Sequence, residues 1–322
     1  MTKPNWSLLV AARENGGRIT QARLAEIITP CELEGELAAF SRMGYRFSTN
    51  ARGTLVLEGW PRRLFAEEIE HGLGTDVIGR RVETHWSAGS TNDLARAEAK
   101  RGRDGTVHFA EEQTRGRGRF GRVWTAPKFS SLLFSVALNS PAPPVKADAL
   151  ALAGAVAVAE AISQVHNLPA RIRWPNDVLI EGRKVSGVLV EDLGAVGERR
   201  WLVMGVGVNV NVDMAALPAE VAKVAGSISE SLGHDADRAA LARAVLRRLD
   251  FWWEVLKTGD TARIAASSRK LSSIIGTFVT VESKGKRYTG RVVDIDTQVG
   301  LVLHLGGGPT QVFAPEETTV IW

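Results

Sequence analysis

Four arginines and three glycines lie in EEQTRGRGRFGRVW, from Glu111 to Trp124. Glycine lets successive backbone N–H groups converge on an anion, and arginine adds planar forks that bind phosphate or carboxylate through two hydrogen bonds. No Gly-Lys-Ser/Thr follows, so this is not a Walker loop. Composition alone leaves two interpretations open, a mobile anion clamp and a basic surface loop for nucleic acid. The position between an apolar strand and Trp124 favours the clamp.

Other short segments carry polar groups suited to a small ligand. GSTN, residues 89–92, offers hydroxyl and amide groups, although Ser90 and Asp93 also have the spacing of a helix capping box. In RWPND, Asn176 and Asp177 follow a proline and could equally form a hairpin-turn pair. GVGVNVN alternates core-facing valines with glycines that let a ligand approach the strand at Gly205 and Gly207.

The elements that must position these groups follow from hydrophobic periodicity. Between residues 61 and 270, strand-like runs alternate with helical segments, and tight turns between many strands favour a largely antiparallel or mixed sheet with helices on one side. The runs are GTVHFAEE, SLLFSVAL, VLIEG, KVSGVLVE and WLVMGVGVNVNV, and the helical segments lie near residues 93–101, 147–167 and 238–256. ALALAGAVAVA, residues 149–159, is too short for a membrane span and predicts a buried helix.

The two parts of the chain that flank this region have different sequence patterns. Residues 6–59 show helix, helix, turn, helix and hairpin, the shape of a winged helix-turn-helix, and Thr29, Pro30 and Glu32 predict a capped third helix that ends at Gly44. From residue 274 the chain alternates β-branched with polar residues, which fits a small barrel. We therefore expect an α+β chain of three domains: 1–62 winged helix-turn-helix-like, 63–270 mixed α/β and 271–322 β-barrel.

Composition and charge set limits on function. With 322 residues, 44% hydrophobic and 24% charged, the chain is expected to be globular, and its net charge of +4 and pI near 9.4 favour anionic partners. The single Cys31 excludes an internal disulfide and suits a reducing cytosol. His85, His108 and His166 lie apart in the sequence, so no metal cluster is expected. No targeting segment is visible, and a cytoplasmic location is expected.

Several of these motifs together resemble one family. GRGRFGRVW resembles the Gly-Arg-Gly-Arg-Arg-Gly-Arg-x-Trp loop of biotin protein ligases, with Phe120 in place of an arginine. GSTN, RWPNDVLIEGRKVSGVLVE, GVGVNVN and the terminal barrel match in the same order, over most of residues 80–322. The resemblance implies a catalytic domain of the class II synthetase and biotin ligase type, followed by an SH3-like barrel.

The resemblance also implies a reaction and partners. Biotin and MgATP give biotinyl-5'-AMP and pyrophosphate, and the biotinyl group then passes to a lysine of the biotin carboxyl carrier protein of acetyl-CoA carboxylase. The implied ligands are biotin, ATP and Mg²⁺. With no metal cluster expected from the histidines, Mg²⁺ should arrive with ATP and be held largely by phosphate and one or two carboxylates. A homodimer through the edge of the central sheet is also implied, since dimers of the family often form there.

The resemblance assigns roles to individual residues. Lys184 and Arg119 are expected to offset charge in nucleotidyl transfer, and Asp177 to orient or deprotonate the incoming lysine. The expected biotin-binding residues are Ser90, Thr91, Asn92, Gln113, Gly116, Arg117 and Gly187. The expected adenylate-binding residues are Arg117, Gly118, Arg119, Arg122, Trp124, Asn176, Lys184 and Asn209. VAGSISE stands where Ala-Thr-Ser-Leu is usual, so the resemblance assigns no adenine contact there.

The N-terminal pattern resembles the bifunctional members of the family, which also repress biotin operons. The start of its third helix presents Glu32, Glu34 and Glu36 where such a helix meets bases and phosphates, and no Lys or Arg precedes Arg42 in that helix. Acidic residues near a helix start also simply stabilise the helix. The sequence therefore disfavours DNA binding.

Two rival functions stay open at this stage. A lipoate or octanoyl ligase would activate a similar acid, but the Arg-Arg-x-x-Gly-Gly-Gly segment with a following histidine is missing. A transcription regulator could bind biotin or biotinyl-AMP without ligase activity, but retention of Lys184, Asp177 and the arginine loop argues against lost catalysis.

Overall fold

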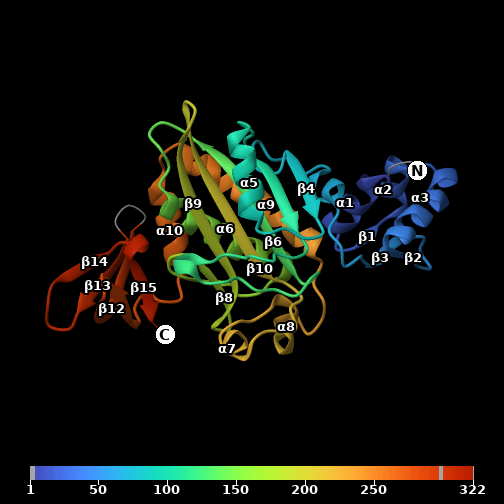
Figure 1. The fold of residues 1–322 in the computed structure, drawn as a ribbon. Coiled ribbons are helices and arrows are strands. Elements are labelled where there is room, and N and C mark those ends of the chain that lie inside the picture. Colours follow the sequence, from blue (N-terminus) through green and yellow to red (C-terminus); the bar gives the residue numbers. More distant parts are fainter. Residues whose placement is uncertain (1–3, 297–299, 322) are drawn as a thin grey trace.

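The structure is a computed structural model that describes residues 4–296 and 300–321 (Figure 1). Three sheets follow one another along the chain, with three strands near the N-terminus, seven in the centre and five near the C-terminus. The expected limits 1–62 and 271–322 include residues 1–3, 297–299 and 322, which lie outside the described residues.

The N-terminal part holds the expected helices and hairpin. Its elements are α1 (Trp6–Glu14), β1 (Arg18–Ile19), α2 (Gln21–Ile27), α3 (Pro30–Met43), β2 (Arg46–Thr49) and β3 (Leu55–Gly59), with sheet order β1-β3-β2. The capping box of α3 is confirmed, because the Glu32 carboxylate accepts a hydrogen bond from the Thr29 N–H, and Gly44 ends the helix in a left-handed conformation. The two-residue β1 is too short to leave a sequence pattern.

Buried ion pairs hold the N-terminal part against the central part. Arg13 of α1 binds Glu68 of α4 (Ala66–Glu70) and, at 2.7 Å from Nε to Oδ2, Asp237 at the start of α9. Trp6 also packs on Phe65, with ring centroids 6.2 Å apart. Removing one member of a buried pair leaves the other without a partner, which typically costs about 3–5 kcal/mol, so this contact fixes how the two parts meet.

The central sheet has the order β4-β5-β6-β10-β9-β8-β7. Its strands are β4 (Arg81–His85), β5 (Thr106–Ala110), β6 (Ser131–Ser140), β7 (Arg171–Arg173), β8 (Asp177–Ile180), β9 (Arg183–Val196) and β10 (Arg199–Asn209). The pair β4–β5 is parallel and the other neighbours are antiparallel, which confirms a mixed sheet. β4 and β7 were not expected, because both are short and rich in charged residues.

Helices cover both faces of this sheet (Figure 1), so the expectation of helices on one side is wrong. Alternate residues of β6 join two different cores. One core, with α6 (Ala147–His166) and α9 (Arg238–Lys257), takes Leu132, Phe134, Val136 and Leu138. The other, with α5 (Thr91–Lys100), takes Ala137 and includes Ala95 and Ala99. The continuous apolar run of β6 is therefore the signature of a strand buried on both sides.

The remaining helices frame the central sheet. They are α7 (Ala219–Ala222), α8 (Ile228–Leu232) and α10 (Thr261–Leu271), with the short 3-10 turns η1 (Arg119–Gly121) and η2 (Met214–Ala216). By length and composition α6 could cross a membrane, but most of its surface is buried inside the protein. It is a core helix, as its alanine-rich sequence predicts.

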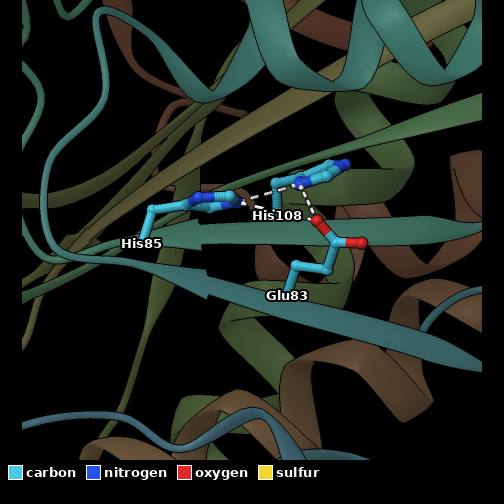
Figure 2. A group of neighbouring side chains, drawn as sticks. All are labelled: Glu83, His85 and His108. Atoms are coloured by element: carbon cyan, nitrogen blue, oxygen red, sulfur yellow. Dashed lines mark hydrogen bonds and ion pairs between the residues drawn. The ribbon is translucent and has the colours of Figure 1, made fainter.

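Parallel pairing of β4 with β5 brings two histidines together. His85 Nε2 lies 3.1 Å from His108 Nδ1, and the Glu83 carboxylate faces both rings (Figure 2). The expectation that these histidines form no cluster of metal-ligating groups is therefore wrong for His85 and His108, which gather with Glu83. They are separated by 23 residues in sequence, and only the β4–β5 register, which the sequence does not reveal, makes them neighbours.

The C-terminal part is an antiparallel sheet in the order β14-β13-β12-β11-β15. Its elements are β11 (Phe278–Ser283), β12 (Lys286–Asp296), β13 (Gly300–Leu305), β14 (Thr310–Phe313), η3 (Pro315–Glu317) and β15 (Thr318–Ile321). It lies at the opposite end of the molecule from the N-terminal part (Figure 1). Its last strand, β15, reaches the pocket described next.

Candidate active site

A pocket of about 190 Å³ opens where the arginine-glycine loop, the strands β8, β9 and β10, and β15 meet. Most residues expected from the sequence line it: Ser90, Thr91, Asn92, Gln113, Arg117, Gly118, Arg119, Arg122, Trp124, Asn176, Asp177, Lys184 and Gly187. They come from five separate stretches of chain. Their convergence in one cavity is what a ligand site requires.

Two expected residues stand behind the wall of the pocket. A side chain at Gly116 would begin 2.2 Å from the carbonyl oxygen of Trp124, so glycine allows the two limbs of the loop to meet there. The buried Asn209 donates from Nδ2 to the carbonyl of Gly226 at 3.1 Å. Neither residue lines the cavity, and both support the chain that does.

The arginine-glycine loop, residues 111–124, folds back on itself. Arg117 pairs with Val123, and the Gly118 N–H donates to the Arg122 carbonyl at 2.8 Å. At its tip Phe120 takes a left-handed conformation, with φ of 56°, and is 56% exposed. The Arg119 guanidinium lies 4.8 Å from the Phe120 ring centroid. Phe120 thus packs against the neighbouring arginine, at the position where the family usually has another arginine.

One end of the pocket is a connected network of polar side chains. Gln113 Oε1 accepts from the Thr91 N–H at 2.8 Å, and the Thr91 hydroxyl lies 2.7 Å from that of Ser135. Ser135 donates to Asn92 Oδ1 at 2.5 Å, and Asn92 Nδ2 donates to Glu191 at 3.0 Å. Sequence reasoning missed the roles of Ser135 and Glu191. Ser135 is fully buried in the middle of β6, between apolar neighbours, and a polar residue at such a position is the available signal.

Ser90 occupies the N-cap position of α5, but its side chain makes no capping hydrogen bond. The capping-box alternative for Ser90 and Asp93 is therefore wrong, and the Ser90 side chain instead lines the pocket. The Asp93 carboxylate binds Arg117 at 2.8 Å, and this hydrogen bond is the main cause of a raised pKa for Arg117. The arginine is thereby held at the rim of the polar network.

The glycines of β9 and β10 make room for protein side chains. A Cβ at Gly205 would lie 2.2 Å from Asn92 Oδ1, and one at Gly207 would lie 2.5 Å from the Trp124 ring. Gly187 gives room to the same ring, at 3.1 Å. Gly205 and Gly207 themselves line the pocket, as expected, and the absence of a side chain there also leaves room for Asn92 and Trp124. Trp124 forms part of the pocket lining.

The other end of the pocket is cationic. Asp177 lies between two cations, with Oδ1 2.5 Å from Lys184 Nζ and Oδ2 2.8 Å from Arg173 Nη2. Sequence reasoning missed Arg173, although it belongs to the RWPND segment and stands four residues before Asp177. Both oxygens of Asp177 are engaged, so its carboxylate orients Lys184. Lys184 Nζ also lies 5.5 Å from the Trp124 ring centroid.

The backbone of Lys184 is fixed by the VAGSISE segment. The Lys184 N–H donates to the Val224 carbonyl at 2.9 Å, and its carbonyl accepts from Gly226 at 2.8 Å. Ser227 then caps α8 by accepting from the N–H of Glu230. The departure from the usual family sequence therefore falls in a segment that positions Lys184.

Arg119 connects the loop to the C-terminal sheet. Its Nη2 donates to the Pro315 carbonyl, and its Nη1 lies 3.4 Å from Asn176 Oδ1. Burial lowers the pKa of Arg119 from its ordinary value. Thr318, Thr319 and Val320 of β15 also line the pocket. Sequence reasoning missed this wall because it comes from the far end of the chain.

A pair of carboxyl groups lies beside this arginine. Asp148, in the first turn of α6, shares a hydrogen bond with Glu316. Burial and this hydrogen bond raise the pKa of Asp148 to about 6 from its ordinary 3.8. A carboxyl group whose pKa is higher in the folded than in the unfolded protein stabilises the fold while it is protonated. This stabilisation is complete below the ordinary pKa and is lost as the pH rises through the raised pKa. The contact between α6 and the C-terminal sheet should therefore weaken between pH 4 and pH 7.

Asp148→Asn should remove this pH dependence and stabilise the protein at pH 7.5 by about 1–2 kcal/mol, a value reduced for the partly exposed site. Urea unfolding at pH 5.0 and pH 7.5 measures the change. Glu67→Gln, at an exposed position, is the matched control and should leave the pH dependence of the native chain unaltered. An equal pH dependence in Asp148→Asn and the native chain would contradict the assignment.

Known proteins resemble the chain in both sequence and fold. Residues 87–209 match the sequence profile of the Biotin/lipoate A/B protein ligase family. The biotin--[acetyl-CoA-carboxylase] ligase of Mycobacterium tuberculosis is 34% identical over 260 residues, which cover 76% of this chain and 93% of that protein. The bifunctional ligase/repressor BirA of Bacillus subtilis is 29% identical over 87% of this chain and 84% of its own length.

A solved structure extends the likeness. The biotin protein ligase of Aquifex aeolicus, in complex with biotin and ATP, superposes with a TM-score of 0.63 at 27% identity, and covers 75% of this chain and 99% of that one. Fold, pocket and sequence profile thus define a protein ligase of the biotin and lipoate class. Within that class, the chain belongs to the biotin protein ligase family and is an enzyme with biotin protein ligase activity.

Proposed function

We propose that this pocket converts biotin and MgATP to biotinyl-5'-AMP, and that the enzyme then transfers biotin to a lysine of the biotin carboxyl carrier protein of acetyl-CoA carboxylase. The main support is the polarity of the cavity, with a hydroxyl and amide network at one end and Lys184, Arg173 and Arg119 toward the other. A ligand with a neutral hydrogen-bonding head and an anionic tail fits this arrangement. The name of the Mycobacterium tuberculosis relative gives acetyl-CoA carboxylase as its substrate, which supports this choice of acceptor.

The polar end suits the ureido head of biotin. A buried ureido group must find both donors and acceptors, because each unpaired polar group costs about 1–3 kcal/mol. Ser90, Thr91, Asn92 and Gln113 offer both kinds of group, and Ser135 holds two of them in place. We assign biotin binding to these residues together with Arg117 and Gly187, while Gly116 keeps the loop closed behind them.

The cationic end suits the carboxylate and phosphates. In the first step a biotin carboxylate oxygen attacks the α-phosphorus of ATP and pyrophosphate leaves. Lys184 and Arg119 offset the negative charge that gathers there, and Mg²⁺ arrives with ATP, held largely by phosphate oxygens. Arg117, Gly118, Arg122, Trp124 and Asn176 line the cavity, and we assign adenylate binding to them, with Asn209 supporting the chain from behind.

In the second step the carrier amine attacks the acyl carbon and AMP leaves. Asp177 lines the pocket and holds Lys184 through their 2.5 Å contact, and we assign to it the orienting or deprotonation of the incoming amine. The arginine-glycine loop excludes water from the mixed anhydride, which would otherwise hydrolyse. β15 completes the enclosure from the C-terminal side.

Intact-mass analysis of a biotin carboxyl carrier domain tests the whole proposal. Incubation with the protein, ATP and Mg²⁺ should add one biotinyl mass, and the gain should vanish when the acceptor lysine is changed to arginine. Lipoate in place of biotin should give no gain. A lipoyl product would show that the polar end has been misassigned, and no product with either acid would favour a regulator without ligase activity.

The domain limits 1–62, 63–270 and 271–322 are part of the proposal. They fall between the three sheets, which supports a winged helix-turn-helix, a catalytic domain of the class II synthetase type and an SH3-like barrel. A cytoplasmic location is part of the same proposal. A homodimer would use an edge of the central sheet, where β4 and β7 are the outer strands.

The N-terminal domain is not expected to bind an operator. Two of the three glutamates at the start of α3 have structural partners: Glu32 caps the helix, and Glu36 accepts from the Asn5 N–H at 2.9 Å. Glu34 is exposed, and carboxylates facing phosphates repel them. Gel-shift titration of genomic fragments with biotin and ATP at physiological salt should show no tight, sequence-specific complex. Such a complex would make the protein a bifunctional repressor, as the Bacillus subtilis relative is named.

A further inference from the structure

A cluster of three metal-ligating side chains lies outside the pocket, on the parallel strands β4 and β5. Glu83 is opposite His108 in the β4–β5 register, and His85 lies two residues along β4 on the same face. Figure 2 shows the two rings and the carboxylate converging. His85 Nε2 lies 3.1 Å from His108 Nδ1, and Glu83 Oε2 lies 3.5 Å from His108 Nδ1 and 4.0 Å from His85 Nε2.

These separations suit a single ion. The donors of a tetrahedral zinc site lie roughly 3.3 Å apart at bond lengths of about 2.1 Å, and two of the three separations here are close to that value. The third, 4.0 Å between Glu83 and His85, closes with a small movement of the two partly exposed side chains. Two imidazoles with one carboxylate favour zinc and related transition metals, whereas Mg²⁺ prefers an all-oxygen shell. The ATP-bound magnesium therefore does not compete for this position.

The surroundings leave the three ligands available. Arg81 binds Oε1 of Glu83 at 2.8 Å, which directs Oε2 toward the histidines. The side chains of Glu83 and His85 are 32% and 30% exposed, so an ion and a water molecule can reach them.

We propose that Glu83, His85 and His108 bind one divalent transition-metal ion, best matched by zinc, with water at the remaining coordination position. The ion links the edge strand β4 to β5 just before the segments that carry Ser90 and Gln113. His108 Nε2 is buried without a hydrogen-bond partner among the described residues. A hydrogen-bond partner on the other ring nitrogen of a ligating histidine is worth roughly 10- to 100-fold in affinity, so we expect moderate rather than extreme affinity for zinc.

Zinc titration of the full-length, metal-stripped protein against a chromophoric chelator tests this site without biotin or ATP. Because the exposed Cys31 could bind zinc itself, Cys31→Ser is the background. We expect one zinc per chain, at least about tenfold weaker binding in His85→Ala and in Glu83→Gln, and no change in the control His304→Ala, whose histidine is exposed on β13. Saturating zinc should raise the Tm of the background by a few degrees, but not that of His85→Ala.

Cobalt provides the second readout. Co²⁺ should give visible absorption bands of a nitrogen and oxygen site without a thiolate charge-transfer band, and His85→Ala should lose them. Equal zinc stoichiometry and affinity in the background and in both variants would overturn the proposal, as would no zinc binding at all by the background protein. Biotinylation of the carrier is scored separately, so failure of the zinc site leaves the ligase proposal untouched.

Discussion

Lys184→Ala is expected to slow formation of biotinyl-5'-AMP by roughly 100- to 1,000-fold, the usual effect of removing one preorganised donor from a site of charge development. Lys184 is the cation that Asp177 holds at 2.5 Å inside the pocket, and its backbone is pinned by Val224 and Gly226. An ammonium group fixed before the substrate arrives does not have to be reorganised during the reaction. Its loss should therefore lower kcat more than it raises the KM for biotin.

Two measurements separate this role from a structural one. Pyrophosphate release reports the first step, and transfer from synthetic biotinyl-5'-AMP to the carrier reports the second. Lys184→Ala should impair the first far more than the second, since Asp177 keeps Arg173 as a partner and the fold persists. Lys223→Ala, at an exposed lysine paired with Glu220, is the matched control. It should release pyrophosphate and transfer biotin to the carrier at the rates of the native chain. Normal pyrophosphate release by Lys184→Ala would remove Lys184 from the catalytic residues.

Local patterns predicted most elements of this fold. The caps of α3, the alanine-rich α6 and the long strands β6, β9 and β10 all carry their structure in a few neighbouring residues. The placement of helices on both faces of the sheet was missed, because periodicity gives the buried character of a strand but not which helix covers each face. The continuous apolar run of β6 does indicate a strand that is buried on both faces.

The sequence motifs predicted most residues of the site, but not the contacts that connect them. The sequence placed Asp177 and Lys184 in one site, but the contact of Asp177 with both Arg173 and Lys184 depends on side-chain geometry across β7, β8 and β9. Ser135 and the β15 wall are distant in sequence from the motifs they support. The pairing of His85 with His108 shows the same limit, since strand register decides it. The spacing of residues along the sequence does not reveal which residues meet across neighbouring strands.

Gly205→Ala is expected to raise the KM for biotin by roughly 10- to 100-fold, because one or two hydrogen bonds of the polar network would be lost at about 1–3 kcal/mol each. The new Cβ would lie 2.2 Å from Asn92 Oδ1 and 3.2 Å from the Ser135 hydroxyl. Neither neighbour can simply turn away. Asn92 is buried and bonded to both Ser135 and Glu191, so relief of the clash breaks at least one of these bonds.

The backbone itself should tolerate alanine, because Gly205 is not among the glycines with positive φ. The effect therefore rests on Asn92, and a double-mutant cycle isolates it. In an Asn92→Ala background there is no amide to displace, so Gly205→Ala should add little to the KM for biotin. Gly35→Ala, where a Cβ meets nothing within 4 Å, is the matched glycine control. If Gly205→Ala raises the KM for biotin equally with and without Asn92, the added methyl group contacts the ligand directly. Glycine would then be needed at this position to make room for biotin rather than for Asn92.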